Sequence, residues 1–215
     1  MRFRDRRDAG RHLGEGLAQA QLVDPIVLAL PRGGVPVGAE VARALGAELD
    51  VLVARKVGAP GHPEFGIGAV AEGGGRVVDW PVVRRLGLSE DDFDALARHE
   101  DAEVAARVAR YRGARELPAL DGRTVVLVDD GLATGVTAEA ALRVLSARHP
   151  ARLLLAVPVC AAPTVDRFRD LAEVVCDHRP EQFHAVGHWY EDFTQVTDDA
   201  MLGCLDEARR RAPSR

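Results

Sequence analysis

The chain has 215 residues, of which 47% are hydrophobic, and this content suffices for one sizeable core in a single domain. Its formal net charge of -5 gives no bulk attraction for nucleic acid, so we expect no nucleic-acid partner. The three cysteines, Cys160, Cys176 and Cys204, lack metal-site spacing and favour reduced thiols in a cytoplasmic protein. We find no apolar run of membrane length and no signal peptide, so we expect no membrane partner.

Helical and strand-like patterns alternate along the chain. We predict an opening helix over 5–22, a long helix that starts at Ser89 and stops at Gly113, and a C-terminal helix over 197–211. Short apolar runs predict five core strands, at 26–30, 49–54, 124–129, 152–157 and 173–176. This order is typical of an α/β fold with a doubly wound, mainly parallel five-stranded sheet. The loops that follow such strands meet along one edge of the sheet.

A glycine turn follows the first strand. The run at 26–30 leads directly into P-R-G-G at 31–34, and helical spacing resumes behind Pro36, which suits a first helical turn. Arg32 would supply positive charge, and Gly33 a backbone that an anion can approach closely. This order of strand, glycine turn and helix predicts an anion site.

A pair of basic residues follows the strand at 49–54. The pair is Arg55 and Lys56, and Lys56 is the only lysine in the chain. An ammonium group on a flexible stem can follow phosphate oxygens through a reaction, which favours a functional role. The next segment, 57–75, is rich in Gly and Pro and is predicted to be a flexible lid loop that excludes water.

The clearest motif is V-V-L-V-D-D-G-L-A-T-G-V-T-A at 125–138. A β-branched strand ends at Asp129 and Asp130, and a Gly/Thr loop at 134–137 opens a helix. Paired carboxylates accept hydrogen bonds from vicinal sugar hydroxyls, whereas backbone N–H groups at a helix start suit a phosphate dianion. A ribose 5-phosphate satisfies both halves of the motif.

These residues resemble the phosphoribosyl pyrophosphate (PRPP) motif of the type I phosphoribosyltransferases. Ala133 ahead of Thr134 and Gly135 is most similar to the adenine phosphoribosyltransferase version, whereas 6-oxopurine enzymes usually carry an Asp there as the base near the purine. The chain as a whole is similar to bacterial phosphoribosyltransferase-like proteins of unassigned acceptor. The resemblance implies a type I phosphoribosyltransferase fold with a small hood and a flexible lid loop. It also implies Mg²⁺-dependent transfer of 5-phosphoribosyl from PRPP to a nitrogen acceptor, such as a nucleobase or related heterocycle, with release of pyrophosphate.

The resemblance assigns roles to individual residues. The implied catalytic groups are Asp129, Asp130, Lys56 and Glu72. The implied ligands of the ribose 5-phosphate part of PRPP are Asp129, Asp130, Gly131, Ala133, Thr134, Gly135, Val136 and Thr137. Pyrophosphate would be bound by Arg32, Gly33, Gly34, Arg55 and Lys56, and Mg²⁺ would be held through water by Asp129 and Asp130. Glu72 would act as a general acid toward the acceptor, and the alternative is a solvated hairpin glutamate.

The acceptor is expected to lie against an aromatic-rich tract at 180–193. Phe183, Trp189 and Tyr190 would stack on a heterocycle, and Asp192 would accept a hydrogen bond from an exocyclic amine. The alternative interpretation is an aromatic cluster that anchors the C-terminal helix.

We expect one phosphoribosyltransferase domain over 1–215, acting as a homodimer. Its core would occupy about 24–160, its lid about 57–75, and its hood with the C-terminal helix about 177–212. Two further functions would keep the same site. One is a PRPP-sensing regulatory protein with little or no catalysis, and the other is a transferase to a non-base acceptor.

Overall fold

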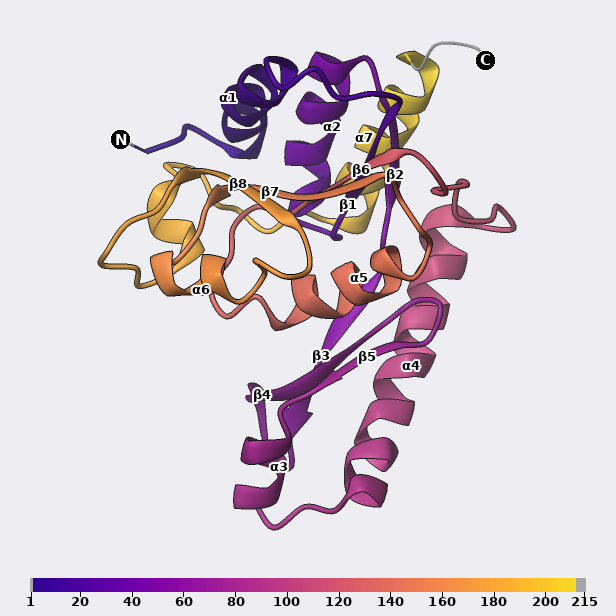
Figure 1. The fold of residues 1–215 in the computed structure, drawn as a ribbon, viewed down its shortest axis with the longest axis vertical. Coiled ribbons are helices and arrows are strands. Elements are labelled where there is room, and N and C mark those ends of the chain that lie inside the picture. Colours follow the sequence, from indigo (N-terminus) through magenta and orange to yellow (C-terminus); the bar gives the residue numbers. More distant parts are fainter. Residues whose placement is uncertain (1, 212–215) are drawn as a thin grey trace.

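The computed structural model describes residues 2–211, so the predicted limits at 1, 212 and 215 lie outside the described residues. Figure 1 shows an upper body and a narrower lower lobe, and the body is built on a five-stranded sheet. The sheet consists of β1 (Pro25–Ala29), β2 (Glu48–Val51), β6 (Thr124–Val128), β7 (Arg152–Val159) and β8 (Glu173–His178). All neighbouring strands are parallel, in the order β2-β1-β6-β7-β8. The predicted α/β fold with a parallel five-stranded sheet is therefore confirmed.

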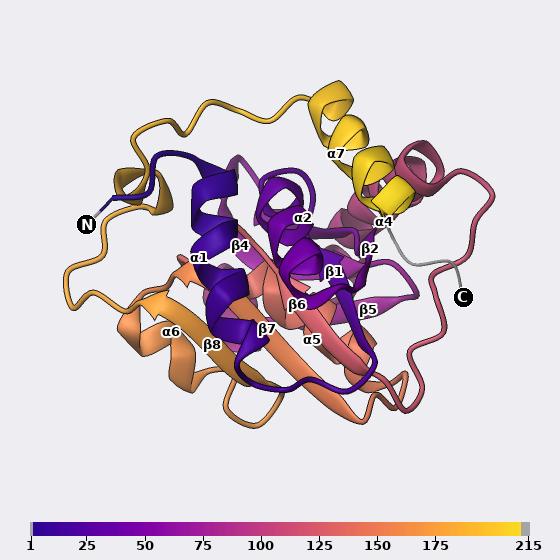
Figure 2. The same cartoon turned by 90° about the horizontal axis from the view of Figure 1, so that it is seen from above.

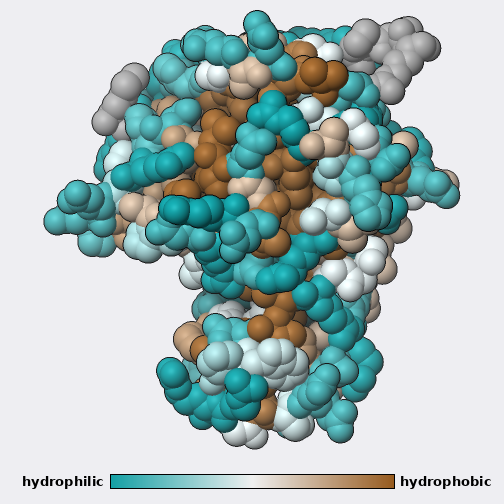
Figure 3. All heavy atoms as spheres, viewed as in Figure 1, coloured by the Kyte–Doolittle hydropathy of each residue, from teal (hydrophilic) through white to brown (hydrophobic). Residues whose placement is uncertain are grey.

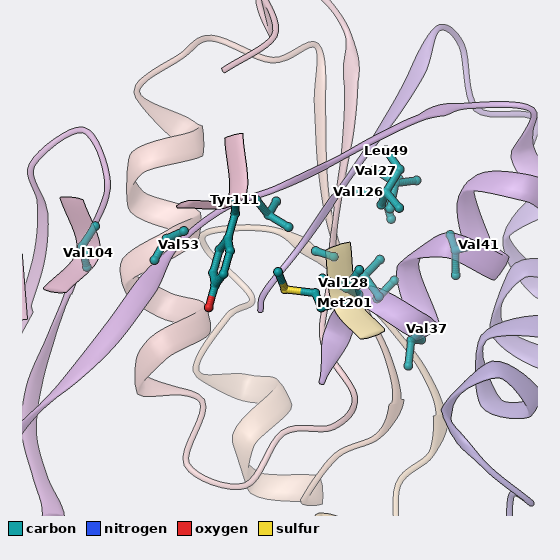
Figure 4. Close-up of a cluster of buried hydrophobic side chains, with 14 of the residues drawn as sticks. Val27, Val37, Val41, Leu49, Val53, Val104, Tyr111, Val126, Val128 and Met201 are labelled. Atoms are coloured by element: carbon teal, nitrogen blue, oxygen red, sulfur yellow. The ribbon is translucent and has the colours of Figure 1, made fainter. Parts of the chain in front are cut away.

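Helices cover both faces of the sheet (Figure 2). One face carries α1 (Arg6–Ala18), α2 (Gly34–Leu45) and α7 (Asp198–Arg211), and the other carries α5 (Val136–Ser146) and α6 (Ala162–Asp166). Val126 and Val128 of β6 pack into the first core with Val41 and Met201 (Figure 4), while Leu127 faces the second core. Strands buried on both faces need side chains that are apolar at every position, which explains their unbroken hydrophobic runs.

The predicted lid segment has a different structure from the one expected. Instead of a loop, the chain forms an antiparallel sheet of β3 (Ala54–Ala59), β4 (His62–Ala71) and β5 (Gly75–Val78), next to α3 (Trp80–Arg85) and α4 (Glu90–Arg112). The loop prediction for 57–75 was wrong because its glycines serve packing. A Cβ on Gly68 would lie 2.7 Å from the Phe93 ring, and one on Gly66 would lie 2.9 Å from the Lys56 stem. Movement of this lobe as a lid stays a prediction.

Apolar residues gather over the body and continue as a narrow strip into the lower lobe, flanked by polar side chains (Figure 3). Beneath the surface of the lobe, α4 packs against β3 and β4, where Phe93 and Ala97 are fully buried. Within residues 2–211, no helix combines the length and the apolar character needed to cross a membrane.

The long helix α4 connects the lobe to the body. Its start, predicted at Ser89, has a capping box, in which the Ser89 hydroxyl accepts from the Asp92 N–H and the Asp92 carboxylate accepts from the Ser89 N–H. At its other end, the Tyr111 hydroxyl donates to the Asp198 carboxylate at 3.0 Å. Helix α4 is therefore fixed at both ends.

Arg112 forms a buried ionic link between the body and the lobe. Its side chain is 3% exposed and donates to both carboxylate oxygens of Glu72, at 2.8 and 3.0 Å. It also donates to the Val51 carbonyl at 2.6 Å, and its Nε lies 3.5 Å from the Asp50 carboxylate. One guanidinium therefore joins α4 to the ends of β2 and β4.

We expect Arg112→Ala to lower the free energy of unfolding by about 3 to 5 kcal/mol, because two buried carboxylates lose their counter-charge. Urea unfolding followed by circular dichroism measures this change. The matched control is Arg98→Ala on the same helix, where the arginine is exposed and its loss should cost less than about 0.5 kcal/mol. Equal losses in the two variants would contradict the structural role of Arg112.

Candidate functional site

Two loops leave adjacent strands at the carboxyl edge of the sheet. Strands β1 and β6 pair in register, with Ala29 opposite Val128, and the Leu30 N–H donates to the Val128 carbonyl at 2.8 Å. The chain beyond β1 forms the turn at 31–34, and the chain beyond β6 begins with the acidic pair. The register therefore brings the two predicted motifs together.

Gly33 and Gly34 carry no Cβ, and this allows the turn at 31–34 to pack against the acidic pair. A Cβ on Gly33 would collide with the Asp130 carboxylate, and one on Gly34 would lie 2.7 Å from the Val128 carbonyl oxygen. The peptide bond between Pro31 and Arg32 is cis. Only glycine therefore fits at positions 33 and 34, the two glycines predicted to bind pyrophosphate.

Arg32 extends from the same turn. Its Nη1 lies 3.5 Å from the Asp198 carboxylate, which also pairs with Arg110 at 2.7 Å. The Arg32 side chain is one-third exposed, and its ion pair is long. Its guanidinium is therefore accessible to an anion at this edge of the sheet.

The acidic pair lies in an environment that disfavours its own charge. Burial raises the pKa of Asp129 well above its ordinary value, and the neighbouring charge of Asp130 raises that pKa further. Burial also raises the pKa of Asp130, against a hydrogen bond donated by Arg6 at 2.8 Å. Hydroxyl donors or a cation would relieve this repulsion, so the pair is suited to bind either one.

The loop between β6 and α5 presents unused hydrogen-bond donors. Within residues 2–211, no backbone N–H from 133 to 138 donates a hydrogen bond, and α5 has no side-chain cap. Gly135 has φ 71°, and a Cβ there would overlap the Phe168 ring. The Thr164 hydroxyl donates to the Ala133 carbonyl at 2.8 Å and so fixes the loop from outside. This arrangement fits a phosphate dianion.

The remaining residues of that loop lie where the motif predicts. Gly131 is buried against Val186 of the 3-10 helix η1 (Val186–Trp189), where a Cβ would collide with the valine side chain. Thr134 is exposed, and Val136 and Thr137 are half-buried at the start of α5. The structure therefore brings the predicted ligands of ribose 5-phosphate together.

The two basic residues on β3 point to opposite sides of the small sheet. Lys56 pairs with Ala69, which packs against Ala140 of α5, so Lys56 lies on the face that carries α5. Its Nζ donates to the Glu64 carbonyl at 2.7 Å and to the Glu64 carboxylate at 3.2 Å. Arg55 faces α4 and is paired there with Glu100. Only Lys56 thus lies on the side of the loop that opens α5.

Glu72 is separated from the groups with which it was predicted to act. It lies on the α4 side of the small sheet, where Arg112 holds both of its carboxylate oxygens. Among the contacts of the described residues, none joins Glu72 to the acidic pair or to Lys56. Its proposed acid role stays a prediction, and its contacts favour a structural one.

Tyr190 was predicted to stack on the acceptor, but it is buried at 3% exposure. Its hydroxyl donates to the Asp130 carbonyl at 2.6 Å, and its ring lies 4.9 Å from that of Phe193 and 5.7 Å from that of Phe3. The ring has no free face for a heterocycle. Tyr190 instead supports the backbone of the acidic pair.

The rest of the aromatic tract is more accessible. Phe183 and Trp189 are half-buried, and Asp192 is exposed, with its carboxylate accepting from the Thr194 N–H at 2.9 Å. The Phe3 N–H donates to the Trp189 carbonyl at 2.9 Å. The tract is therefore anchored by the N-terminal residues, whereas the alternative interpretation placed it against the C-terminal helix.

Sequence reasoning missed Arg6, which contacts the Asp130 carboxylate directly. It occupies the first turn of α1, far from every motif in the sequence. Because all of the chain's 28 basic residues except Lys56 are arginine, no compositional signal distinguishes it.

Comparison with known proteins agrees with this geometry. The family model for the phosphoribosyl transferase domain matches residues 7–192. Two curated proteins named "putative phosphoribosyl transferase", from Mycobacterium tuberculosis strains CDC 1551 / Oshkosh and ATCC 25618 / H37Rv, are each 47% identical over 209 residues. These matches cover 97% of this chain but 47% of each relative, so the chain spans about half the length of those relatives.

A solved structure is similar over nearly its whole length. The crystal structure of TT1426 from Thermus thermophilus is 48% identical, with a TM-score of 0.82. The match covers 96% of this chain and 99% of that one. From the family model and these relatives, we conclude that the chain belongs to the phosphoribosyl transferase domain family.

Proposed function

We propose that this chain transfers the 5-phosphoribosyl group of PRPP to a nitrogen acceptor and releases pyrophosphate. The observation that carries the proposal is the acidic pair next to a loop of unused N–H donors. Asp129 and Asp130 would accept from the 2′- and 3′-hydroxyls of ribose, and the N–H groups of 133–138 would bind the 5-phosphate. One sugar phosphate spans both halves of the site.

The reaction exchanges one bond at ribose C1. The bond from C1 to the pyrophosphate oxygen breaks, pyrophosphate leaves with the electron pair, and a bond from C1 to the acceptor nitrogen forms as that nitrogen loses a proton. Positive charge develops at C1 during this exchange, and the neighbouring carboxylates oppose it. Arg32, the Gly33 N–H and Lys56 would receive the departing pyrophosphate, whereas the Gly34 N–H already donates to the Leu30 carbonyl. Arg55 would contribute only on release from Glu100.

Magnesium fits this site when it enters with the substrate. Within residues 2–211, no cluster of three or more His, Cys, Asp or Glu side chains is arranged to hold a metal ion. Mg²⁺ commonly binds one or two carboxylates together with substrate phosphates, and Asp129 and Asp130 supply the carboxylates. When bound, the ion would neutralise the charge on the pyrophosphate group.

We infer that the acceptor is a nucleobase or a related heterocycle, bound near Phe183 and Trp189. Ala133 supplies no base at the position where a 6-oxopurine enzyme carries an Asp, so the acceptor must be recognised by other groups. We also propose that the protein acts as a homodimer. A screen of nucleobases, amines and aminoglycosides for PRPP-dependent pyrophosphate release tests the acceptor class. Release with amines or aminoglycosides but with no nucleobase would overturn the proposal of a heterocyclic acceptor.

Once a productive acceptor is known, Asp129→Asn combined with Asp130→Asn should abolish pyrophosphate release. The amides keep the volume of the side chains but lose the charge that binds the sugar and opposes the positive charge at C1. The midpoint temperature of thermal unfolding should change little, because the lost repulsion between two half-buried carboxylates offsets the lost ion pair of Arg6 with Asp130. Asp121→Asn in an exposed turn is the control. Undiminished pyrophosphate release in the double variant would reject the assignment.

Glu72→Gln distinguishes a catalytic from a structural role for that side chain. We expect the free energy of unfolding to fall by about 2 to 4 kcal/mol, because the buried Arg112 loses half of its counter-charge. The turnover number per folded molecule should change less than about threefold, since the side chain does not face the acidic pair. A hundredfold loss of turnover with unchanged stability would restore the predicted acid role.

A further inference from the structure

Arg6 is the one cation in direct contact with the acidic pair among residues 2–211. Its Nε lies 2.8 Å from the Asp130 carboxylate, and the two side chains are 11% and 15% exposed. A Cβ on Gly33 would lie 3.4 Å from the same Nε. The guanidinium therefore lies where the glycine turn, the acidic pair and α1 meet.

The other side of the guanidinium contacts the aromatic tract. Its Nη1 donates to the Thr194 carbonyl at 2.9 Å, and its carbon lies 3.9 Å from the centroid of the Phe193 ring and 5.9 Å from that of Tyr190. A planar guanidinium can form an ion pair in its plane and stack on a ring at the same time, which an ammonium group cannot do. Arg6 is thus held by two segments that are far apart in the sequence.

Charge explains why this position benefits from a cation. Asp129 and Asp130 are two adjacent carboxylates in a half-buried site. Their negative charge repels a polyanionic ligand that must enter the same site. The positive charge of Arg6, 2.8 Å from the Asp130 carboxylate, opposes this repulsion. The contact also fixes which way the Asp130 carboxylate points.

We propose that Arg6 is a positioning residue of this site, which holds the Asp130 carboxylate beside the turn at 31–34 and ties the segment 190–194 to it. The part of this inference that concerns substrate rests on the proposed function. The part that concerns the tie between α1, Asp130 and the aromatic tract stands on the contacts alone. The position of the acceptor-side segment thereby depends on the same carboxylate that would hold the sugar.

Hydrogen–deuterium exchange tests the tie without any substrate. In Arg6→Met, amides over 190–197 should exchange roughly tenfold faster, because a charge-assisted hydrogen bond and a stacked ring contact are both lost. The control is Arg11→Met on the same helix, whose arginine pairs with Asp8 at 3.1 Å and, among residues 2–211, with no group of the segment 190–197, so exchange there should be unchanged. Unchanged exchange in Arg6→Met, or equal acceleration in the control, would overturn the tie.

Calorimetric titration with ribose 5-phosphate tests the effect on the sugar site. Arg6→Met should weaken binding roughly tenfold, and Arg6→Lys should regain most of it, because lysine restores the charge beside Asp130. Arg6→Lys should nevertheless exchange faster than the parent protein over 190–197, because an ammonium cannot also stack on Phe193. A general loss of stability would not restore ribose 5-phosphate binding in Arg6→Lys while leaving exchange over 190–197 faster than in the parent protein.

The two proposals fail in different ways. If the parent protein binds ribose 5-phosphate but no acceptor gives pyrophosphate release, the transferase proposal fails and both Arg6 measurements still apply. If the parent protein does not bind ribose 5-phosphate, the sugar part of the Arg6 proposal is rejected together with the proposed function. Full binding by Arg6→Met would reject the positioning role while leaving transfer from PRPP intact.

Discussion

The parallel pairing of β1 with β6 determines where the glycine turn and the acidic pair lie relative to each other. Because Ala29 is opposite Val128, the turn at 31–34 and the acidic pair leave the sheet at the same level. A shift of register by one residue would turn Val126 and Val128 away from their core and separate the two loops. The apolar packing that fixes this register on both faces is therefore also what holds the site together.

Two pairs of carboxylates in this structure, one buried and one half-buried, differ in how fully nearby cations compensate their charge. Asp50 and Glu72 share Arg112, whose side chain is nearly inaccessible, and Arg209 lies 3.6 Å from the Asp50 carboxylate, so two cations face these two carboxylates within the protein. Asp129 and Asp130 share only the edge contact of Arg6 with Asp130, and burial raises the pKa of both. The negative charge of Asp129 and Asp130 is not fully compensated, and free N–H donors lie beside it. Such an arrangement indicates ligand binding more strongly than a balanced ion pair does.

The local signals in the sequence predicted the parts of the fold that local chemistry determines. The β-branched run before Asp129, the capping box at Ser89 and the P-R-G-G turn each formed the element expected of them. The small antiparallel sheet was missed because Gly66 and Gly68 resemble loop residues, although their role is to admit Lys56 and Phe93. The distance along a supposed loop also led us to predict that Glu72 and Lys56 act together. In the structure, the two side chains lie on opposite faces of the small sheet.

The parts of the site that sequence reasoning missed depend on long-range contacts. Arg6 and Tyr190 reach the acidic pair from opposite ends of the chain, Arg6 from outside every motif and Tyr190 from the aromatic tract. Tyr190 was assigned to the acceptor because aromatic residues suit heterocycles, but the ring is used to support Asp130. Such roles follow from which segments the fold brings together.

A crystal structure with ribose 5-phosphate and Mg²⁺ tests the central claim most directly. The account predicts the phosphate on the N–H groups of 133–138 and the sugar hydroxyls on Asp129 and Asp130. A sugar phosphate bound elsewhere on the protein, or one whose phosphate lies away from the start of α5, would contradict it.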